Sequence, residues 1–149
     1  MSEIVFKIDI PSDDDGFVTL QCSFCNSRFK LTTADFQSND VIYIFCPYCG
    51  LQNEGNDLLT DEVLEQVHTI AQNYMNSRVN EFMDGLEKSL RGNKHISFKR
   101  GKKLGMEDDK VLFEQEEMEI VQPTCCKRPV KTNHLEVSIG IYCPFCGVK

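Results

Sequence analysis

The chain has 149 residues, a formal net charge of −7 at pH 7 and a sequence pI near 4.9. An acidic chain is repelled by phosphate backbones at long range, which argues against bulk nucleic-acid binding unless the charge is segregated. The N-terminus lacks the basic and apolar regions of a signal peptide, and no apolar run approaches the roughly 18 residues of a membrane span. The eight cysteines are therefore expected in a reducing, cytoplasmic compartment, where cysteine pairs indicate metal or redox chemistry rather than structural disulfides.

The N-terminal part of the chain predicts a small antiparallel sheet. Alternating apolar side chains predict a strand over residues 3–10, and a polar turn follows over residues 11–16. β-Branched and aromatic side chains predict further strands, with a polar connection between the last two; these strands are residues 17–21, 28–31 and 41–45.

Two cysteine pairs flank these strands. They read Cys22-Ser-Phe-Cys25 and Cys46-Pro-Tyr-Cys49-Gly50. A turn with two residues between its cysteines aims both sulfurs at one point, and two such turns form a tetrahedral cage for Zn²⁺ with Zn–S distances of about 2.3 Å. Four thiolates leave no open coordination position, which predicts a structural rather than a catalytic metal. Iron fits the same ligand set, and the sequence does not separate the two metals.

The second of these pairs also has a redox interpretation. The tetrapeptide Cys46-Pro-Tyr-Cys49 occurs in glutaredoxins, where it starts a helix whose dipole lowers the thiol pKa. The residues that follow here, Gly50-Leu-Gln-Asn-Glu-Gly, do not start a helix. A thiol redox protein or a rubredoxin-like iron protein is therefore only a lesser alternative.

A long amphipathic helix is predicted over residues 60–91. Thr60 can cap its N-terminus, acidic residues occupy the first turn, and Gly92-Asn93 stops it. At 1.5 Å per residue the helix is about 46 Å long, more than a small sheet can cover. We expect either that the C-terminal part of the chain folds back along it, or that a protein partner or a second copy of the chain binds it.

A second, irregular cysteine set follows the helix. Strands are predicted over residues 110–113, 118–121 and 135–141, and the cysteines are Cys125, Cys126, Cys143 and Cys146. The first two are adjacent rather than two residues apart. Three alternatives remain open: both ligate a metal, one of them ligates together with His134, or this site binds no metal.

The residue after the second cysteine of such a turn often needs a left-handed backbone conformation, which Gly and Asn tolerate. Asn26, Gly50 and Gly147 occupy three of the four expected positions.

Positive charge is concentrated in two stretches. One is a loop over residues 93–106, and the other is a turn after Cys126; the residues are Lys94, Lys99, Arg100, Lys102, Lys103, Lys127, Arg128 and Lys131. These residues are the candidates for a nucleic-acid interface, and His95 and Phe98 could add base stacking.

Residues 22–50, with the motifs CSFC and CPYCG, resemble a zinc ribbon, and residues 118–149 resemble a degenerate second one. The resemblance implies a metal and a small β fold, but no particular function, because zinc ribbons occur in proteins of many kinds. We therefore expect an α+β protein of two small antiparallel zinc-ribbon-like modules joined by one long helix. The expected divisions are residues 1–57, 58–92, 93–106 and 107–149.

The sequence contains no catalytic constellation, so we do not expect an enzyme, and no small-molecule substrate is evident. The function predicted is that of a zinc-binding adaptor or interaction module in a cytosolic protein complex, with self-association through the helix as one form. The alternative is a nucleic-acid-binding protein that uses residues 94–103 and the turn at 127–131.

Overall fold

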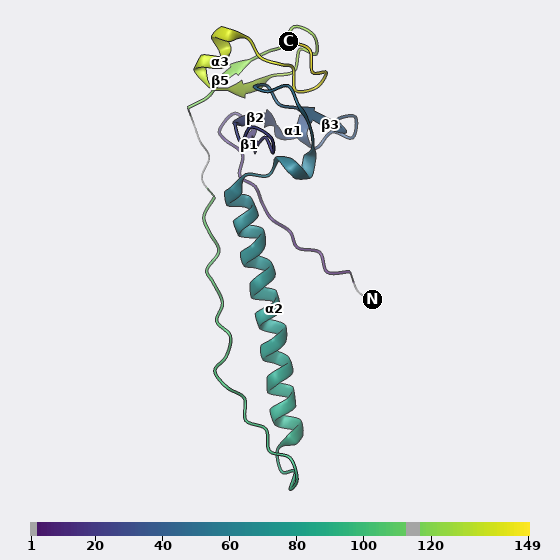
Figure 1. The fold of residues 1–149 in the computed structure, drawn as a ribbon, viewed down its shortest axis with the longest axis vertical. Coiled ribbons are helices and arrows are strands. Elements are labelled where there is room, and N and C mark those ends of the chain that lie inside the picture. Colours follow the sequence, from purple (N-terminus) through teal and green to yellow (C-terminus); the bar gives the residue numbers. More distant parts are fainter. Residues whose placement is uncertain (1–2, 113–116) are drawn as a thin grey trace. The chain divides into compact units, whose positions relative to one another are not determined.

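The computed structural model describes residues 3–112 and 117–149 and shows one long helix with small antiparallel sheets, an α+β arrangement (Figure 1). The strands are β1 (Phe17–Gln21), β2 (Arg28–Thr32), β3 (Tyr43–Phe45), β4 (Gln52–Glu54), β5 (Glu119–Val121) and β6 (Val130–Thr132). The helices are α1 (Thr33–Phe36), a 3₁₀ turn (Gly55–Leu58), α2 (Asp61–Leu90) and α3 (His134–Ile139). The chain divides into two compact units. The sheet unit comprises residues 9–64 with 112–149, and the helix unit comprises residues 1–8 with 65–111.

The two cysteine-rich segments share one sheet. Its strand order is β1-β2-β6-β5, every neighbouring pair is antiparallel, and β2 and β6 lie at the centre. A separate pair, β3 and β4, completes the sheet unit. The buried apolar core comes mainly from the first segment; its residues are Val18, Leu20, Phe29, Leu31, Ile44, Leu58 and Val130.

The two segments are repeats of one design, which we call the first repeat (residues 17–54) and the second repeat (residues 119–149). Leu20 pairs with Phe29 in the first repeat, as Val121 pairs with Val130 in the second. Thr32 and Asn133 each cap the short helix that follows with a side-chain oxygen. The contacts between the repeats are reciprocal: the N–H of Phe45 donates to the carbonyl of Pro144 (2.8 Å), and that of Tyr142 to the carbonyl of Pro47 (2.9 Å). The repeats are therefore related by an approximate twofold axis, as two subunits of a dimer are.

Two lysines lie at the centre of this arrangement. Lys30 of β2 is directly opposite Lys131 of β6, and both are buried. Asp13, in the loop before β1, accepts from both ammonium groups, at 3.2 Å from Lys30 and 2.7 Å from Lys131. Burial raises the pKa of Asp13, but hydrogen bonds from Lys131, the Phe17 N–H and Lys30 outweigh it and lower the pKa to about 2. One carboxylate thus holds together two like charges that would otherwise repel each other across the sheet.

We predict that Asp13→Asn destabilises the protein by about 3 kcal/mol, because the substitution leaves two buried lysines without a shared counter-charge. The measurement is urea unfolding of the metal-loaded protein at pH 7. Asp14→Asn is the matched control, since Asp14 is exposed and is expected to change stability by less than about 0.5 kcal/mol. Equal stability of the two variants would contradict the role given to Asp13.

The start of α2 is fixed within the sheet unit. Thr60 Oγ1 accepts from the N–H of Val63 at 3.4 Å, which confirms Thr60 as the predicted cap. Gln21 at the end of β1 accepts from the N–H of Asp61 at 3.3 Å, and Arg28 of β2 forms an ion pair with Glu62 at 2.8 Å. The helix ends at Leu90, and Gly92 follows with a φ of +87°, so the predicted extent of the helix is confirmed. No helix in the described ranges is long and apolar enough to cross a membrane.

In the helix unit, the extended segment of residues 93–111, here called the strap, runs back along α2 (Figure 1). Side-chain amides on one face of α2 bind the main chain of the strap. Asn80 bonds both the N–H and the carbonyl of Leu104 (3.0 Å each), and Asn73 bonds both groups of Glu107 (2.9 and 2.8 Å). Gln66 accepts from the N–H of Lys110 at 2.8 Å. Seven residues of helix advance about 10.5 Å, which is close to the length of three residues of extended chain. Every seventh residue of α2 can therefore bond every third residue of the strap.

We predict that Asn73→Ala combined with Asn80→Ala raises the rate of amide hydrogen exchange at Leu104 and Glu107 by roughly five- to tenfold, because each N–H loses its acceptor. The measurement is residue-resolved hydrogen exchange. Asn76→Ala is the control, since Asn76 donates to the carbonyl of Gly105 at 2.8 Å, and its oxygen accepts from Gln72 of the helix at 3.1 Å. Unchanged exchange in the double variant would show that these bonds do not hold the strap.

Several predicted strands are wrong. Residues 3–10 form no strand, and Phe6 instead contacts Tyr74 edge-on, with 5.3 Å between ring centroids. Residues 135–141 hold α3 rather than a strand, because Asn133 caps a helix and the alternating side chains there are largely exposed. Residues 110–112 are not a strand, and residue 113 lies outside the described residues. The strands at residues 17–21, 28–31, 41–45 and 118–121 are confirmed within two residues, whereas the connection at 32–39 contains α1.

Candidate metal centres

The first thiol cluster consists of Cys22, Cys25, Cys46 and Cys49, whose sulfurs all lie within 4.8 Å of one another. The Sγ atoms of Cys22 and Cys49 are 3.7 Å apart, and those of Cys25 and Cys46 are 3.6 Å apart. A tetrahedron with metal–sulfur distances of about 2.3 Å has edges of about 3.8 Å, so the sulfurs are already spaced for a tetrahedral ion. The donor set, four thiols and no other group, fits zinc or iron and leaves no position for substrate.

The turns that carry these cysteines have the expected backbone. Asn26 (φ +59°) and Gly50 (φ +72°) follow the two cysteine pairs in the left-handed conformation. The N–H of Asn26 donates to the carbonyl of Cys22, and that of Gly50 donates to the carbonyl of Cys46. Glycine is needed at position 50 for a second reason, because a Cβ there would lie 3.0 Å from the ring of Tyr142 in the other repeat.

A buried asparagine supports the first cluster. Asn53, in β4, is 2% exposed; its amide donates to Cys22 Sγ at 3.6 Å, and its oxygen accepts from Ser23 Oγ at 2.7 Å. Asn53 therefore orients the turn of Cys22 and Cys25 from β4, in the way that a residue hydrogen-bonded to a metal ligand orients that ligand. Sequence reasoning missed Asn53 because it lies among other polar residues in a stretch interpreted as a polar connection, residues 51–59. The one signal was its place a few residues beyond Cys49, on the return strand of the turn.

The surroundings of the thiols affect their ionisation in different ways. Burial raises the pKa of Cys22, but hydrogen bonds from the N–H groups of Cys25 and Phe24 and from Asn53 outweigh it, and the pKa is lowered to about 7. Burial raises the pKa of Cys46 well above its ordinary value. Metals bind thiolates, so metal binding to this cluster releases protons. The affinity of the cluster for a metal therefore decreases as the pH falls.

The second thiol cluster contains both adjacent cysteines. The sulfurs of Cys125, Cys126, Cys143 and Cys146 lie within 4.8 Å of one another, and those of Cys125 and Cys146 are 3.4 Å apart. His134 is not in this cluster, because its Nδ1 contacts the Glu119 carboxylate at 2.6 Å and the side chain is exposed. The structure therefore brings together the residues of the first of the three alternatives, in which both adjacent cysteines are ligands. Cys125 and Cys126 both lie close to Cys143 and Cys146.

The backbone explains how adjacent cysteines can share one site. Lys127 has a φ of +54°, and its N–H donates to the carbonyl of Pro123 at 2.9 Å, just as Asn26 donates to Cys22 in the first repeat. Cys126 therefore takes the place of Cys25, and Pro123 takes the place of Cys22. The missing thiol is supplied from inside the turn by Cys125. Gly147 (φ +75°) completes the set of left-handed residues, so the three predicted positions are confirmed and Lys127 is the fourth.

The candidate nucleic-acid residues belong to two different units, and four of the eight are paired with carboxylates among the described residues. Arg100 and Lys103 pair with Asp84 in the helix unit. In the sheet unit, Arg128 pairs with Asp40 at 2.9 Å, and Lys131 is buried against Asp13 and Asp15.

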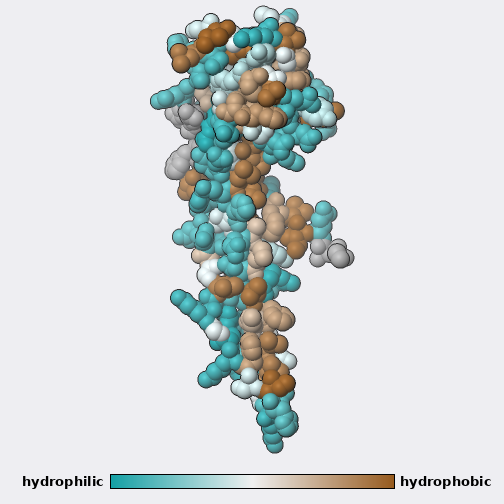
Figure 2. Space-filling view, in the orientation of Figure 1, coloured by the Kyte–Doolittle hydropathy of each residue, from teal (hydrophilic) through white to brown (hydrophobic). Residues whose placement is uncertain are grey.

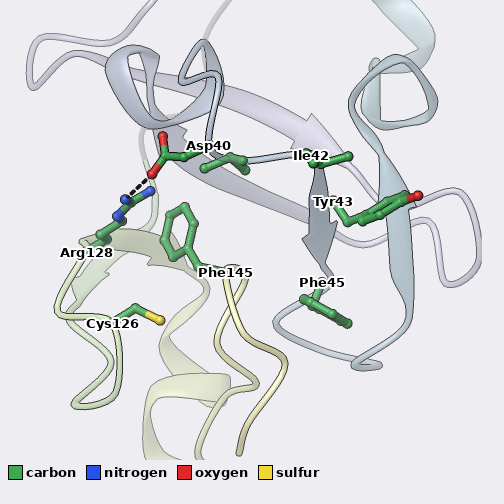
Figure 3. Close-up of a pocket in the computed structure, with 8 residues that line it drawn as sticks. Asp40, Ile42, Tyr43, Phe45, Cys126, Arg128 and Phe145 are labelled. Atoms are coloured by element: carbon green, nitrogen blue, oxygen red, sulfur yellow. Dashed lines mark hydrogen bonds and ion pairs between the residues drawn. The ribbon is translucent and has the colours of Figure 1, made fainter.

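A cavity of about 520 Å³ lies beside the second thiol cluster, within the sheet unit (Figure 3). Arg128, held by Asp40, lies over the ring of Phe145 with its guanidinium carbon 5.1 Å from the ring centroid, and Cys126 lies close by. Ile42 and Phe45 line the side formed by the first repeat. The lining consists of aliphatic and aromatic side chains, the Asp40–Arg128 ion pair and the thiol of Cys126.

Comparison with protein-family models, curated proteins and solved structures found no match to this chain.

We predict that Cys46→Ser removes the metal of the first cluster and prevents stable folding of the sheet unit, because metal binding and folding are linked in small thiolate sites. Elemental analysis and thermal unfolding are the measurements. Phe24→Ala is the control, since it changes an exposed residue in the turn between Cys22 and Cys25 and leaves all four thiols. Unchanged metal content and melting in Cys46→Ser would contradict the prediction, and strong visible absorption by the wild-type protein would identify iron rather than zinc.

Proposed function

We propose that this chain is a non-enzymatic interaction module, in which two structural zinc ions hold the sheet unit and the apolar face of α2 binds a protein partner or a second copy of the chain. The observation that carries the binding part of the proposal is the lack of an apolar core in the helix unit. Within residues 3–8 and 65–111, the fully buried side chains are Gln66 and Thr69, both polar.

The two thiol clusters support the structural part of the proposal. Both contain four thiols at zinc-binding distances, and in both the ligands come from two turns of one repeat. Each repeat is short and the shared apolar core is small, so metal ions are a physically reasonable source of the remaining stability. Complete thiolate sites also support a structural role, because they leave no position for a catalytic water.

The two sides of α2 differ in what covers them. The amides of Asn73 and Asn80 face the strap, whereas Met75 and Phe82 lie on roughly the opposite side, given 3.6 residues per turn. Val79 lies between these two sides and also borders a cavity lined by Phe98 and Leu104 of the strap. Met75 is 60% exposed, Val79 is 41% exposed and Phe82 is 64% exposed. Figure 2 shows apolar residues along this part of the molecule. The strap therefore satisfies the polar face of the helix and leaves an apolar stripe uncovered.

An exposed apolar stripe on a long helix is suited to packing against another helix. Such pairing buries amphipathic faces without requiring a groove in the partner. Helices in proteins gain most of their stability from tertiary packing of their apolar face. A partner that covers the stripe would therefore stabilise α2.

We predict that Phe82→Asp abolishes self-association or partner binding, because it places a charge at the most exposed residue of the stripe. Light scattering measures the mass of the purified chain, and co-purification with a tagged chain measures partner binding. Phe24→Asp is the matched control, since Phe24 is similarly exposed (61%) but lies in the first thiol turn. The proposal would be overturned if the wild-type chain is a monomer and captures no protein that Phe82→Asp fails to capture.

The nucleic-acid alternative is less well supported. Four of its eight candidate residues form ion pairs with acidic residues, which reduces the charge available to phosphates. Low-salt gel-shift titration with single-stranded and duplex DNA and RNA distinguishes the two functions. Binding that disappears when Lys94, Lys99 and Lys102 are changed to Gln would favour the alternative instead.

A further inference from the structure

The two thiol clusters occupy equivalent places in the two repeats but differ in their exposure to solvent. In the first cluster, Cys22 and Cys46 are fully buried (0% exposed). In the second, only Cys143 is buried; Cys126 is half-buried, and Cys125 and Cys146 are exposed. Cys25 of the first cluster is also exposed and Cys49 is half-buried, so the first cluster presents one exposed thiol to solvent and the second presents two.

The difference extends to the sulfurs that lie closest together. In the first cluster, the close pairs Cys22–Cys49 and Cys25–Cys46 each contain one buried sulfur. In the second cluster, the close pair is Cys125–Cys146 at 3.4 Å, and both residues are exposed. An oxidant can therefore reach both partners of a pair only in the second cluster.

The cause of this difference lies in the first turn of the second repeat. Pro123 replaces the buried cysteine at the start of the turn, and the replacement thiol, Cys125, comes from the outer part of the turn. The cavity of about 520 Å³ beside Cys126 and Phe145 gives solvent a further approach to the cluster.

We propose that the second thiol cluster is an oxidation site, at which a peroxide joins Cys125 to Cys146 and releases the zinc of that cluster while the first cluster keeps its zinc. This inference rests on the proposed zinc occupancy of both clusters. Accessible thiolates are the reactive ones, and a neighbouring thiol resolves the first oxidation product.

The chemistry balances with hydrogen peroxide as the oxidant. One exposed thiolate attacks a peroxide oxygen, the O–O bond breaks, and the departing hydroxide takes a proton from solvent, leaving a sulfenic acid. The second thiolate attacks that sulfur, the S–O bond breaks, and the hydroxide again leaves as water. Two thiolates lose two electrons in total, and one peroxide becomes two waters. Only Cys126 and Cys143 then remain as ligands, too few to hold the ion tetrahedrally.

The experiment begins with the zinc content of the full-length chain, measured by elemental analysis before oxidation. The chain is then mixed with hydrogen peroxide, and released zinc is followed with a chromogenic chelator. Digestion and mass spectrometry at half-release identify the disulfide. We expect two zinc ions per chain at the start, loss of one well before the other, and Cys125 joined to Cys146.

The outcomes separate the inference from the proposed function. Fewer than two zinc ions at the start would contradict the proposed function and this inference together. Two zinc ions released at the same rate, release from the first cluster before the second, or a first disulfide between other cysteines would overturn the inference alone.

Cys125→Ser supplies an independent check on the same site. We expect it to slow peroxide-driven zinc release at least about tenfold, because Cys146 loses its exposed resolving partner. Should this variant bind no second zinc, alkylation of the wild-type chain with N-ethylmaleimide decides the question. Labelling of Cys125 and Cys146 ahead of Cys22 and Cys46 supports the inference, and the reverse order overturns it.

Discussion

The pairing of β2 with β6 is the contact on which the sheet unit depends. It joins two segments that are separated in the sequence by the whole of α2 and the strap, and it places Lys30 against Lys131 at the centre of one sheet. The first thiol turn of each repeat lies between two strands of that sheet, β1 and β2 in one repeat and β5 and β6 in the other, so the same pairing positions half of each cluster. The lysine pair would oppose this pairing without the carboxylates of the loop before β1, since Asp13 pairs with both lysines and Asp15 pairs with Lys131. That loop is thereby tied to both repeats.

The helix unit is built on a different principle. The strap is held by hydrogen bonds from side-chain amides of α2 to its main chain and by its own Arg100, which donates to Asn80 and pairs with Asp84. Its apolar side chains contribute less, since Leu104 and Met106 remain about half exposed. Exposed hydrogen bonds of this kind contribute modestly each, and a stable unit normally also needs buried apolar surface. The sheet unit has a small core and two thiol clusters, whereas the described residues of the helix unit, 3–8 and 65–111, contain neither.

The sequence predicted those features that depend on local chemistry. The spacing of the first two cysteine pairs, the left-handed residues after them and the ends of α2 all follow from short-range rules, and the structure bears them out. The strand over residues 135–141 was wrong because alternation of apolar residues indicates a strand only when one face is buried, and Leu135 is 72% exposed. The sharing of one sheet by both repeats, and the support that Asn53 gives to Cys22, depend on contacts between distant residues. A single sequence carries no direct signal for such contacts.

The approximate twofold relation between the repeats has a consequence for how this protein can vary. In a dimer of identical chains, every substitution appears at both symmetric positions, so a change that suits one site is imposed on the other. Here the two halves are encoded separately within one chain. One half can keep a protected pair of turns while the other exchanges a cysteine for Pro123 and adopts a neighbouring one. Covalent linkage of the halves thus allows one fold to carry two sites of the same composition and different accessibility.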